Sequence, residues 1–401
     1  MNVAASHKLP PNHAVALPLG FHAHVTNIGI KDASNDFVIV AADSVCSAAG
    51  VFTQSSFAGP SVLVSREHVA SHSARAVVVI SKNANVATGA QGLANAREVV
   101  AAVATSLGCA TDDVLIASTG VIGRQYPMDR VRDGLAHIPT PLAGTDATAV
   151  ANGIMTTDTV AKVATSVAGA ATVVGVAKGV GMIEPDMATL ITLIFTDAEI
   201  APSDLDAITR RVIASTFNCV SIDTDTSTSD TAIVMASGVA GPVDPEVFEV
   251  ALHEVALSLT KQVARDGEGA TKLIEAHVDH ASSADQARRV AKAIVNSPLV
   301  KTAVHGADPN WGRVAMAIGK STSGRPGSPD YVDQTRVVIR FGSQDVYPAQ
   351  VDADGLAALA EYMRSDDIRI HVSLGAGQAE GAAWGCDLTD GYVRINADYT
   401  T

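Results

Sequence analysis

The sequence predicts a layered α+β protein rather than a doubly wound parallel sheet, and three observations favour that class. Hydrophobic residues make up 47% of the chain and charged residues 17%, a composition typical of a well-packed globular protein. Short apolar runs with the pattern of strands are mixed with segments that have helical periodicity, and the two kinds do not alternate strictly. The length of 401 residues also exceeds what one hydrophobic core usually serves, so we expect two domains.

In the first third of the chain, strands are predicted at 36–42, 75–89 and 113–123. The first two are apolar runs that end in Gly and Asn, residues that interrupt a strand. A helix is predicted at 93–108, because its valines recur on one face of a 3.6-residue period and Gly108 follows the last of them.

The rest of the chain continues the mixture of strands and helices. Further strand patterns occur at 189–196, 231–238 and 335–342. Helical patterns occur at 202–218, 244–266 and 283–297, and the first of these begins with Pro-Ser-Asp, a favourable start for a helix.

Charge and cysteine usage exclude several classes of protein. Acidic residues outnumber Lys and Arg by 42 to 28, and a net charge of −14 repels nucleic acid and anionic lipid. The four cysteines are far apart, so neither a disulfide framework nor a zinc site is predicted. The first residues lack the pattern of a signal peptide, and no run approaches the ~20 apolar residues that span a bilayer. We expect a cytoplasmic protein without nucleic-acid or membrane partners.

The stretch AKGVGMIEPDMATLITLIFTDAEI, residues 177–200, combines a Gly- and Pro-containing loop with an apolar strand that begins at Thr189. A threonine hydroxyl is a weak nucleophile unless a base takes its proton, and the α-amine of an N-terminal threonine is such a base. Attack of the Thr189 hydroxyl on the Ala188 carbonyl, followed by hydrolysis of the ester, would create that amine. From the residues alone, an ordinary loop that leads into a buried strand is the simpler interpretation of this stretch.

Several motifs in order change this interpretation. The segments IASTGVIGRQYPM, IMTTDT, AKGVGMIEPDMATL, SIDTDTSTSDTA, DGEGATKLIE, NSPLVKTAVHGADPNWGR and DLTDGYVRINADYTT are similar to motifs of the ornithine acetyltransferase family, also called the glutamate N-acetyltransferases. The resemblance extends over the chain from about residue 20. Some of the motifs are most similar in sequence to those of the family member associated with clavulanic acid biosynthesis.

The resemblance implies a fold and an assembly. The expected fold is a layered α/β/β/α core of the self-processing aminopeptidase type, at 1–285, followed by a smaller α+β domain at 286–401. The tail of the smaller domain is expected to return to the active site. Self-cleavage between Ala188 and Thr189 is expected to leave two chains that remain associated, and the family pairs two such processed chains into an α2β2 heterotetramer.

The resemblance also implies roles for individual residues. Thr189 is the acetyl acceptor, and Thr119 and Gly120 form the oxyanion hole. The substrate-binding residues that the resemblance implies are Thr156, Lys178, Thr189, Glu268, Asn396 and Thr401. Thr157 is the alternative to Thr156 in this set. A lysine suits a substrate carboxylate and a glutamate suits an ammonium group, although each is also a common solvated surface residue.

The implied function is transfer of acetyl from N2-acetyl-L-ornithine to L-glutamate through an acetyl-threonine intermediate, in arginine biosynthesis or in a duplicate that serves secondary metabolism. We expect no cofactor and no metal. One alternative is a self-processed amidase or aminopeptidase with water as the acceptor, and another is an uncleaved binding protein on the same scaffold. The sequence leaves open whether acetyl-CoA is also a donor.

Three other patterns are less specific. The stretch 223–234 resembles the start of a calcium loop but lacks the required Gly and Glu, so it is interpreted as a hydrogen-bonded loop. Glu275, His277 and Asp279 alternate on one strand face and could bind a metal, but a solvated face explains them as well. The glycines of GAGQAEGAAWG do not have the spacing of a dinucleotide fingerprint.

Overall fold

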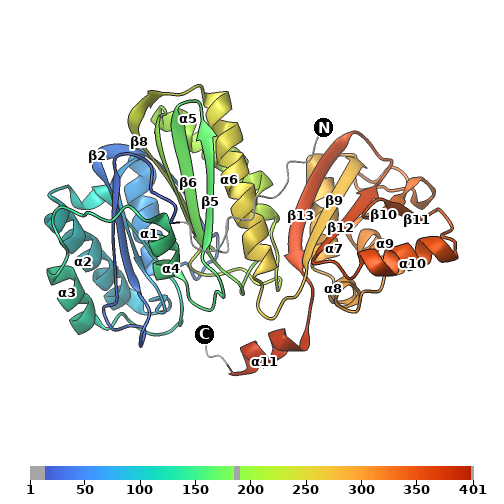
Figure 1. Ribbon diagram of the computed structural model, residues 1–401, viewed down its shortest axis with the longest axis horizontal. Coiled ribbons are helices and arrows are strands. Elements are labelled where there is room, and N and C mark those ends of the chain that lie inside the picture. Colours follow the sequence, from blue (N-terminus) through green and yellow to red (C-terminus); the bar gives the residue numbers. More distant parts are fainter. Residues whose placement is uncertain (1–13, 185–189, 399–401) are drawn as a thin grey trace.

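The computed structural model describes residues 14–184 and 190–398, and these form two lobes, each built on one sheet (Figure 1). The larger sheet has the order β4-β3-β2-β8-β7-β6-β5, with β1 paired to β2. Its strands are β1 (Phe21–Thr26), β2 (Phe37–Phe52), β3 (Ser73–Ile80), β4 (Val114–Ser118), β5 (Lys162–Ala168), β6 (Ala171–Lys178), β7 (Ile191–Glu199) and β8 (Thr231–Pro242).

Strand β2 divides the larger sheet into two layers. It is 16 residues long, and its pairing with β3 shifts register between Ala41 and Cys46, a bulge that bends the strand. The half before the bulge pairs with β1 and β3, and the half after it pairs with β8. The two halves of the sheet therefore face each other, and Phe21 of β1 meets Phe195 of β7 between them, with ring centroids 5.1 Å apart.

The alternation of side chains in these strands produces three apolar layers. One set of alternate residues in β3, β4, β6, β7 and β8 fills the space between the two halves of the sheet. The opposite set in β3 and β4 packs against α2 (Gly89–Leu107) and α3 (Met128–Ala136). The corresponding outer side chains of β6, β7 and β8 pack against α5 (Pro202–Ser215) and α6 (Pro245–Arg265). The predicted α/β/β/α layering is therefore present, and its two sheet layers are continuous through β2.

The smaller sheet has the order β11-β10-β12-β9-β13. Helices α7 and α9 pack on one of its faces. The strands of this sheet and the remaining helices are β9 (Leu273–Ala281), β10 (Val338–Phe341), β11 (Gln344–Tyr347), β12 (Asp367–Ser373), β13 (Ala379–Cys386), α1 (Pro60–His68), α4 (Ala147–Ile154), α7 (Ala284–Val295), α8 (Pro298–His305), α9 (Trp311–Ser321), α10 (Ala353–Tyr362) and α11 (Asp390–Asp398). The boundary at 285/286 stays a prediction, although β9, which precedes it, pairs within the smaller sheet.

Local signals explain most element ends. Helix α6 begins at Asp244-Pro245, where the Asp244 carboxylate accepts a hydrogen bond from the Glu246 amide at 2.8 Å. Helix α2 ends at Gly108, which has a φ of 66°. The strand predicted at 75–89 is too long: β3 ends at Ile80, and residues of the following segment with positive φ cannot continue a strand.

No helix in the described part of the chain is long and apolar enough to cross a bilayer. The four cysteines are free thiols, and three of them are buried. Burial raises the pKa of Cys46 to about 12. These thiols are packing residues and are not disposed to react as thiolates.

Candidate active site

A cavity of about 460 Å³ lies where segments from distant parts of the sequence, between Thr119 and Asn396, converge. Its walls come from the segment after β4, the turn after α4, the end of β6, the loop before β8, the loop after α6, and α11. Helix α11 leads back from the smaller lobe toward the larger one (Figure 1). Six residues predicted from separate motifs line this cavity: Thr119, Gly120, Thr156, Lys178, Glu268 and Asn396.

Three predicted residues lie outside the described part of the chain, namely Ala188, Thr189 and Thr401. The residues that follow Thr189, Leu190 and Ile191, line the cavity. Leu190 is held at the start of β7, because its carbonyl accepts a hydrogen bond from the Thr231 amide at 3.0 Å.

Thr119 and Gly120 follow β4 and are fixed by the backbone beside them. The Thr119 amide donates to Ile80 O at 3.2 Å, and the Val121 amide donates to Lys82 O at 3.1 Å. Gly120 has a φ of 129°, and a Cβ there would lie 2.1 Å from the carbonyl carbon of Lys82. The position therefore accommodates glycine alone, and the close contact fixes how the Thr119–Gly120 backbone faces the cavity.

Lys178 is the last residue of β6 and its side chain is almost fully buried. Its ammonium donates a hydrogen bond to Thr119 Oγ1 at 3.4 Å, which brings a positive charge beside the Thr119–Gly120 pair. Burial lowers the pKa of Lys178, and the nearby Asp158 carboxylate opposes that shift.

Asp158 supports this wall of the cavity although the sequence analysis did not single it out. Its carboxylate accepts hydrogen bonds from the Thr156 amide at 3.0 Å, the Gly179 amide at 2.7 Å and Lys162 Nζ at 2.7 Å. Burial alone would raise the pKa of Asp158, but Lys178 and Lys162 bring it down to about 2. Asp158 is therefore an ionised anchor that joins the Thr156 turn to the end of β6.

Lys162 extends the same network to the opposite wall. It is fully buried, and its ammonium also contacts Asp266 at 2.5 Å. Asp266 lies two residues before Glu268, so the lysine ties the turn after α4 to the loop after α6. The motif MTTDT contained Asp158, and Lys162 lies four residues after it, which was the available sequence signal. Gly179 and Asp266 lie too far along the chain for a local pattern to reveal their part in the network.

Glu268 receives hydrogen bonds from two sides. Its carboxylate accepts from Thr157 Oγ1 at 3.2 Å and from Asn396 Nδ2 of α11 at 2.9 Å. Its amide donates to Val180 O at 2.8 Å, and a Cβ on Gly181 would lie 2.5 Å from Glu268 Oε2. Thr157 thus contacts a predicted binding residue, whereas Thr156 lines the cavity beside it.

An acidic wall formed by the loop 223–230 completes the cavity. Asp223 accepts from the Met182 and Ile183 amides at 2.6 Å and 2.7 Å, which agrees with the interpretation of this stretch as a hydrogen-bonded loop. Burial raises the pKa of Asp230 well above its ordinary value, and its Oδ2 has no hydrogen-bond partner among the described residues. The sequence analysis did not predict that this loop faces the site.

The arrangement combines a buried cation, a fixed Thr-Gly backbone and a carboxylate-rich wall. A developing oxyanion is stabilised by fixed donors and a nearby cation in a site that excludes water. The carboxylates that also line the cavity suit an ammonium group. The charges and size of the cavity therefore suit a small zwitterion.

Known proteins resemble this chain in sequence and in structure. The model of the ArgJ family matches residues 22–401. "Arginine biosynthesis bifunctional protein ArgJ 2" of Nostoc sp. is 54% identical over 97% of this chain and 99% of its own length. "Glutamate N-acetyltransferase Oat2" of Streptomyces clavuligerus is 52% identical over 96% of this chain and 98% of its own. The solved ornithine acetyltransferase of Mycobacterium tuberculosis complexed with ornithine is 32% identical, with a TM-score of 0.39, over 44% of this chain and 96% of its own.

Proposed function

The chain belongs to the ArgJ family, and we propose that it is a glutamate N-acetyltransferase of arginine biosynthesis. It moves acetyl from N2-acetyl-L-ornithine to L-glutamate and releases L-ornithine and N-acetyl-L-glutamate. Relatives whose names state this activity or this pathway match almost the whole chain at more than half identity. The observation that carries the proposal is the convergence of six residues from separate motifs on one cavity.

We propose Thr189 as the nucleophile, because the residues directly after it line the cavity. Self-cleavage of the Ala188–Thr189 bond supplies an α-amine whose ordinary pKa of about 7.7–8.0 makes it a base near neutral pH. That amine takes the hydroxyl proton as the oxygen attacks the acetyl carbonyl of acetylornithine. The proton then passes to the departing nitrogen, the C–N bond breaks, and ornithine leaves.

Glutamate enters next with its amine uncharged and attacks the acetyl-threonine ester. The C–O bond breaks, the amine proton returns to the Thr189 oxygen through the α-amine, and N-acetylglutamate leaves. Both tetrahedral intermediates carry a negative oxygen, which Thr119 Oγ1 and the Gly120 amide stabilise with the help of the Lys178 charge. This order of events predicts ping-pong kinetics.

The charges on the cavity walls fit the substrates of this reaction. Acetylornithine carries an α-carboxylate and a δ-ammonium group. We propose that Lys178 pairs with the carboxylate and that Glu268, which lines the same cavity as the acidic wall, pairs with the ammonium. Asn396 binds Glu268 and thereby fixes its direction. Thr401, which lies outside the described residues, is also proposed as a substrate-binding residue.

We further propose that the two self-cleaved chains stay associated and pair into an α2β2 heterotetramer in the cytoplasm. Analytical ultracentrifugation of the processed protein tests the assembly. A mass of about two processed pairs is expected, and a mass of one pair would contradict it.

The experiment that tests the function compares Thr189→Ala with Thr192→Val. Thr192 is buried in β7 and its hydroxyl has no hydrogen-bond partner among the described residues, so the isosteric change to valine is a matched control. The unchanged protein and the control run as two fragments on a denaturing gel, whereas Thr189→Ala runs as one band of 41.1 kDa. Processing or turnover by Thr189→Ala would contradict the proposal.

Intact mass spectrometry then identifies the intermediate. Incubation with N-acetylornithine adds ~42 Da, one acetyl group, to the C-terminal fragment. Addition of glutamate removes that mass and yields N-acetylglutamate. Loss of the acetyl group as acetate, at the same rate with and without glutamate, would instead identify the alternative, a hydrolase.

A further inference from the structure

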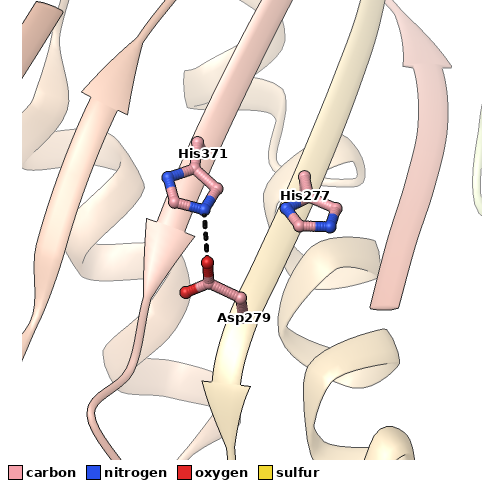
Figure 2. A group of neighbouring side chains, drawn as sticks. All are labelled: His277, Asp279 and His371. Carbon is pink, nitrogen blue, oxygen red and sulfur yellow. Dashed lines mark hydrogen bonds and ion pairs between the residues drawn. The ribbon is translucent and has the colours of Figure 1, made fainter. Parts of the chain in front are cut away.

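Outside the cavity, two histidines and an aspartate meet on one face of the smaller sheet. Strands β9 and β12 are parallel neighbours, with His277 opposite His371 and Asp279 opposite Ser373. Alternate side chains of a strand point to the same face, so His277, Asp279 and His371 lie together, as Figure 2 shows. The intervening residues of these strands pack on the other face against the core under α7 and α9.

We propose that His277, Asp279 and His371 bind a divalent transition-metal ion such as Zn²⁺. One donor atom from each residue lies within 4.8 Å of the other two. Zinc bonds to histidine nitrogen and carboxylate oxygen at about 2.0–2.2 Å. Side-chain rotations that shift the donor atoms by about 1 Å therefore bring all three onto one ion. A water molecule completes the tetrahedron.

His277 is arranged as a ligand. Its Nδ1 is buried and has no hydrogen-bond partner among the described residues, a costly state for a ring nitrogen. Its Nε2 lies 3.5 Å from the Glu380 carboxylate of β13, which is on the other side of β9 from β12. In Figure 2 a ring nitrogen of His277 lies on the side of the other two side chains. The His277 and His371 rings are stacked, with centroids 5.3 Å apart and planes 17° apart, so the His277 ring must turn to direct Nδ1 at the ion. A carboxylate behind a ligating imidazole is a common support for metal binding.

The other two ligands already contact each other. His371 Nε2 lies 2.8 Å from Asp279 Oδ2, the dashed line in Figure 2. Asp279 Oδ1 lies 2.8 Å from His280 Nδ1, so its second oxygen is also supported. An ion that enters this group takes the lone pairs of the two facing atoms, and the proton shared between them leaves to water or moves to the other nitrogen of His371.

Two cationic neighbours oppose the ion. Arg369, two residues before His371 on β12, lies on the same face of the sheet, with its Nε 3.5 Å from the Glu275 carboxylate. Arg340 Nη1 lies 3.4 Å from His371 Nδ1, although its charge is partly balanced by Asp345, 2.6 Å from Arg340 Nε. The two guanidinium groups weaken binding of a dication relative to a site whose ligands are all supported by carboxylates. Two imidazoles with one carboxylate still favour Zn²⁺, Co²⁺ or Ni²⁺ over Mg²⁺ and Ca²⁺, which prefer sets of oxygen ligands.

The position assigns the ion a structural role. It joins β9 to β12, the adjacent strands at the interior of the sheet order β11-β10-β12-β9-β13. None of the three ligands lines the acetyl-transfer cavity, so metal binding and acetyl transfer are expected to be separable. The sequence analysis considered His277 and Asp279 with Glu275 and expected no metal, because a solvated strand face explained their alternation. It did not consider His371, which lies almost a hundred residues away.

The test measures Zn²⁺ retained by the untagged full-length protein after loading and dialysis. We expect about one equivalent per chain, and we expect Co²⁺ in its place to show ligand-field bands of a tetrahedral site. Variants His277→Ala and His371→Ala should weaken binding by at least ~10-fold, and Glu380→Gln by about 10-fold. The matched control is His253→Ala, a histidine on α6 outside this group.

Two results would overturn the proposal: no retained Zn²⁺ in the unchanged protein, or full retention in both histidine variants. Circular dichroism and thermal unfolding report whether the variants are folded, and we expect both to match the unchanged protein without metal. If a variant does not fold, the cobalt spectrum of the unchanged protein tests the site by itself. A spectrum that shows only the bands of hydrated Co²⁺ would refute the site. The outcome does not depend on whether the proposed acetyltransferase activity is correct.

Discussion

Substitution of Gly120 by alanine tests the role of the Thr119–Gly120 backbone. The new Cβ would lie 2.1 Å from the carbonyl carbon of Lys82 and 2.3 Å from its oxygen, and both are backbone atoms that cannot rotate away. Ordinary contact begins at 3.4 Å, so the two segments must separate by about 1.3 Å. A displacement of ~1 Å in a catalytic group reduces the rate by about 10²-fold, equivalent to about 2.7 kcal/mol in the activation free energy.

Gly123→Ala is the matched control for this substitution. Gly123 also has a positive φ, 81°, but a Cβ at this position would have no atom within 4 Å, and the residue is exposed. It therefore imposes comparable backbone strain, about 1–2 kcal/mol, without moving the backbone at the cavity. We expect its kcat to stay within about twofold of the unchanged enzyme.

The assay measures kcat and KM for acetyl transfer from N-acetylornithine to glutamate, together with thermal unfolding. For Gly120→Ala we expect a fall in kcat with a smaller change in KM, because an oxyanion donor acts on the transition state rather than on bound substrate. A Gly120→Ala enzyme within about threefold of the unchanged kcat would refute the proposed oxyanion hole. Equal losses in the two glycine variants would assign the effect to strain alone.

Glu268→Gln should raise KM for N-acetylornithine about tenfold, the effect of losing one charge-assisted interaction, while the exposed Glu254→Gln on α6 leaves it unchanged. Thr157→Ala removes the hydroxyl that binds Glu268 and should raise KM about fivefold, and a larger effect of Thr156→Ala would instead assign the substrate contact to Thr156. Asp158→Asn should destabilise the fold by about 2 kcal/mol at pH 7, from a pKa lowered from 3.8 to about 2. Because a depressed carboxyl pKa stabilises above the unfolded value, urea unfolding should show this difference unchanged above pH ~4 and lost as pH falls toward 2.

Much of the fold follows from local sequence patterns. The helices predicted at 202–218, 244–266 and 283–297 are found within a few residues of their observed ends. The second half of β2 and its bend were not predicted, because the apolar run ends at Ala42 and the exposed Asp43 and Ser44 follow. Only the strand pairing shows that β2 continues to Phe52. Local periodicity thus identifies elements, whereas the separation into layers depends on contacts between distant strands.

Site residues could be predicted only where they lie in motifs that resemble a known family. Lys178 and Glu268 were identified through resemblance, and the bare residues would have been interpreted as solvated charges. Asp158, Lys162 and Asp266 were missed because their pairing joins positions 104 residues apart. Residue spacing does not reveal such a buried network. The network nevertheless acts on the pKa of Lys178, which Asp158 raises and Lys162 lowers, and it fixes Asp266, two residues before Glu268.

The position of β7 explains how a chain could be cut before it and keep one active site. β7 pairs with β6, which precedes the proposed cleavage bond, and with β8, which follows it. β8 in turn pairs with β2, so separating the two fragments would break two ladders inside one sheet and open the core between the layers. The hydrogen bond from Thr231 to Leu190 still holds the start of β7 at the cavity. A cut at the proposed Ala188–Thr189 bond would therefore leave β7 paired on both sides, with Leu190 and Ile191 still at the cavity.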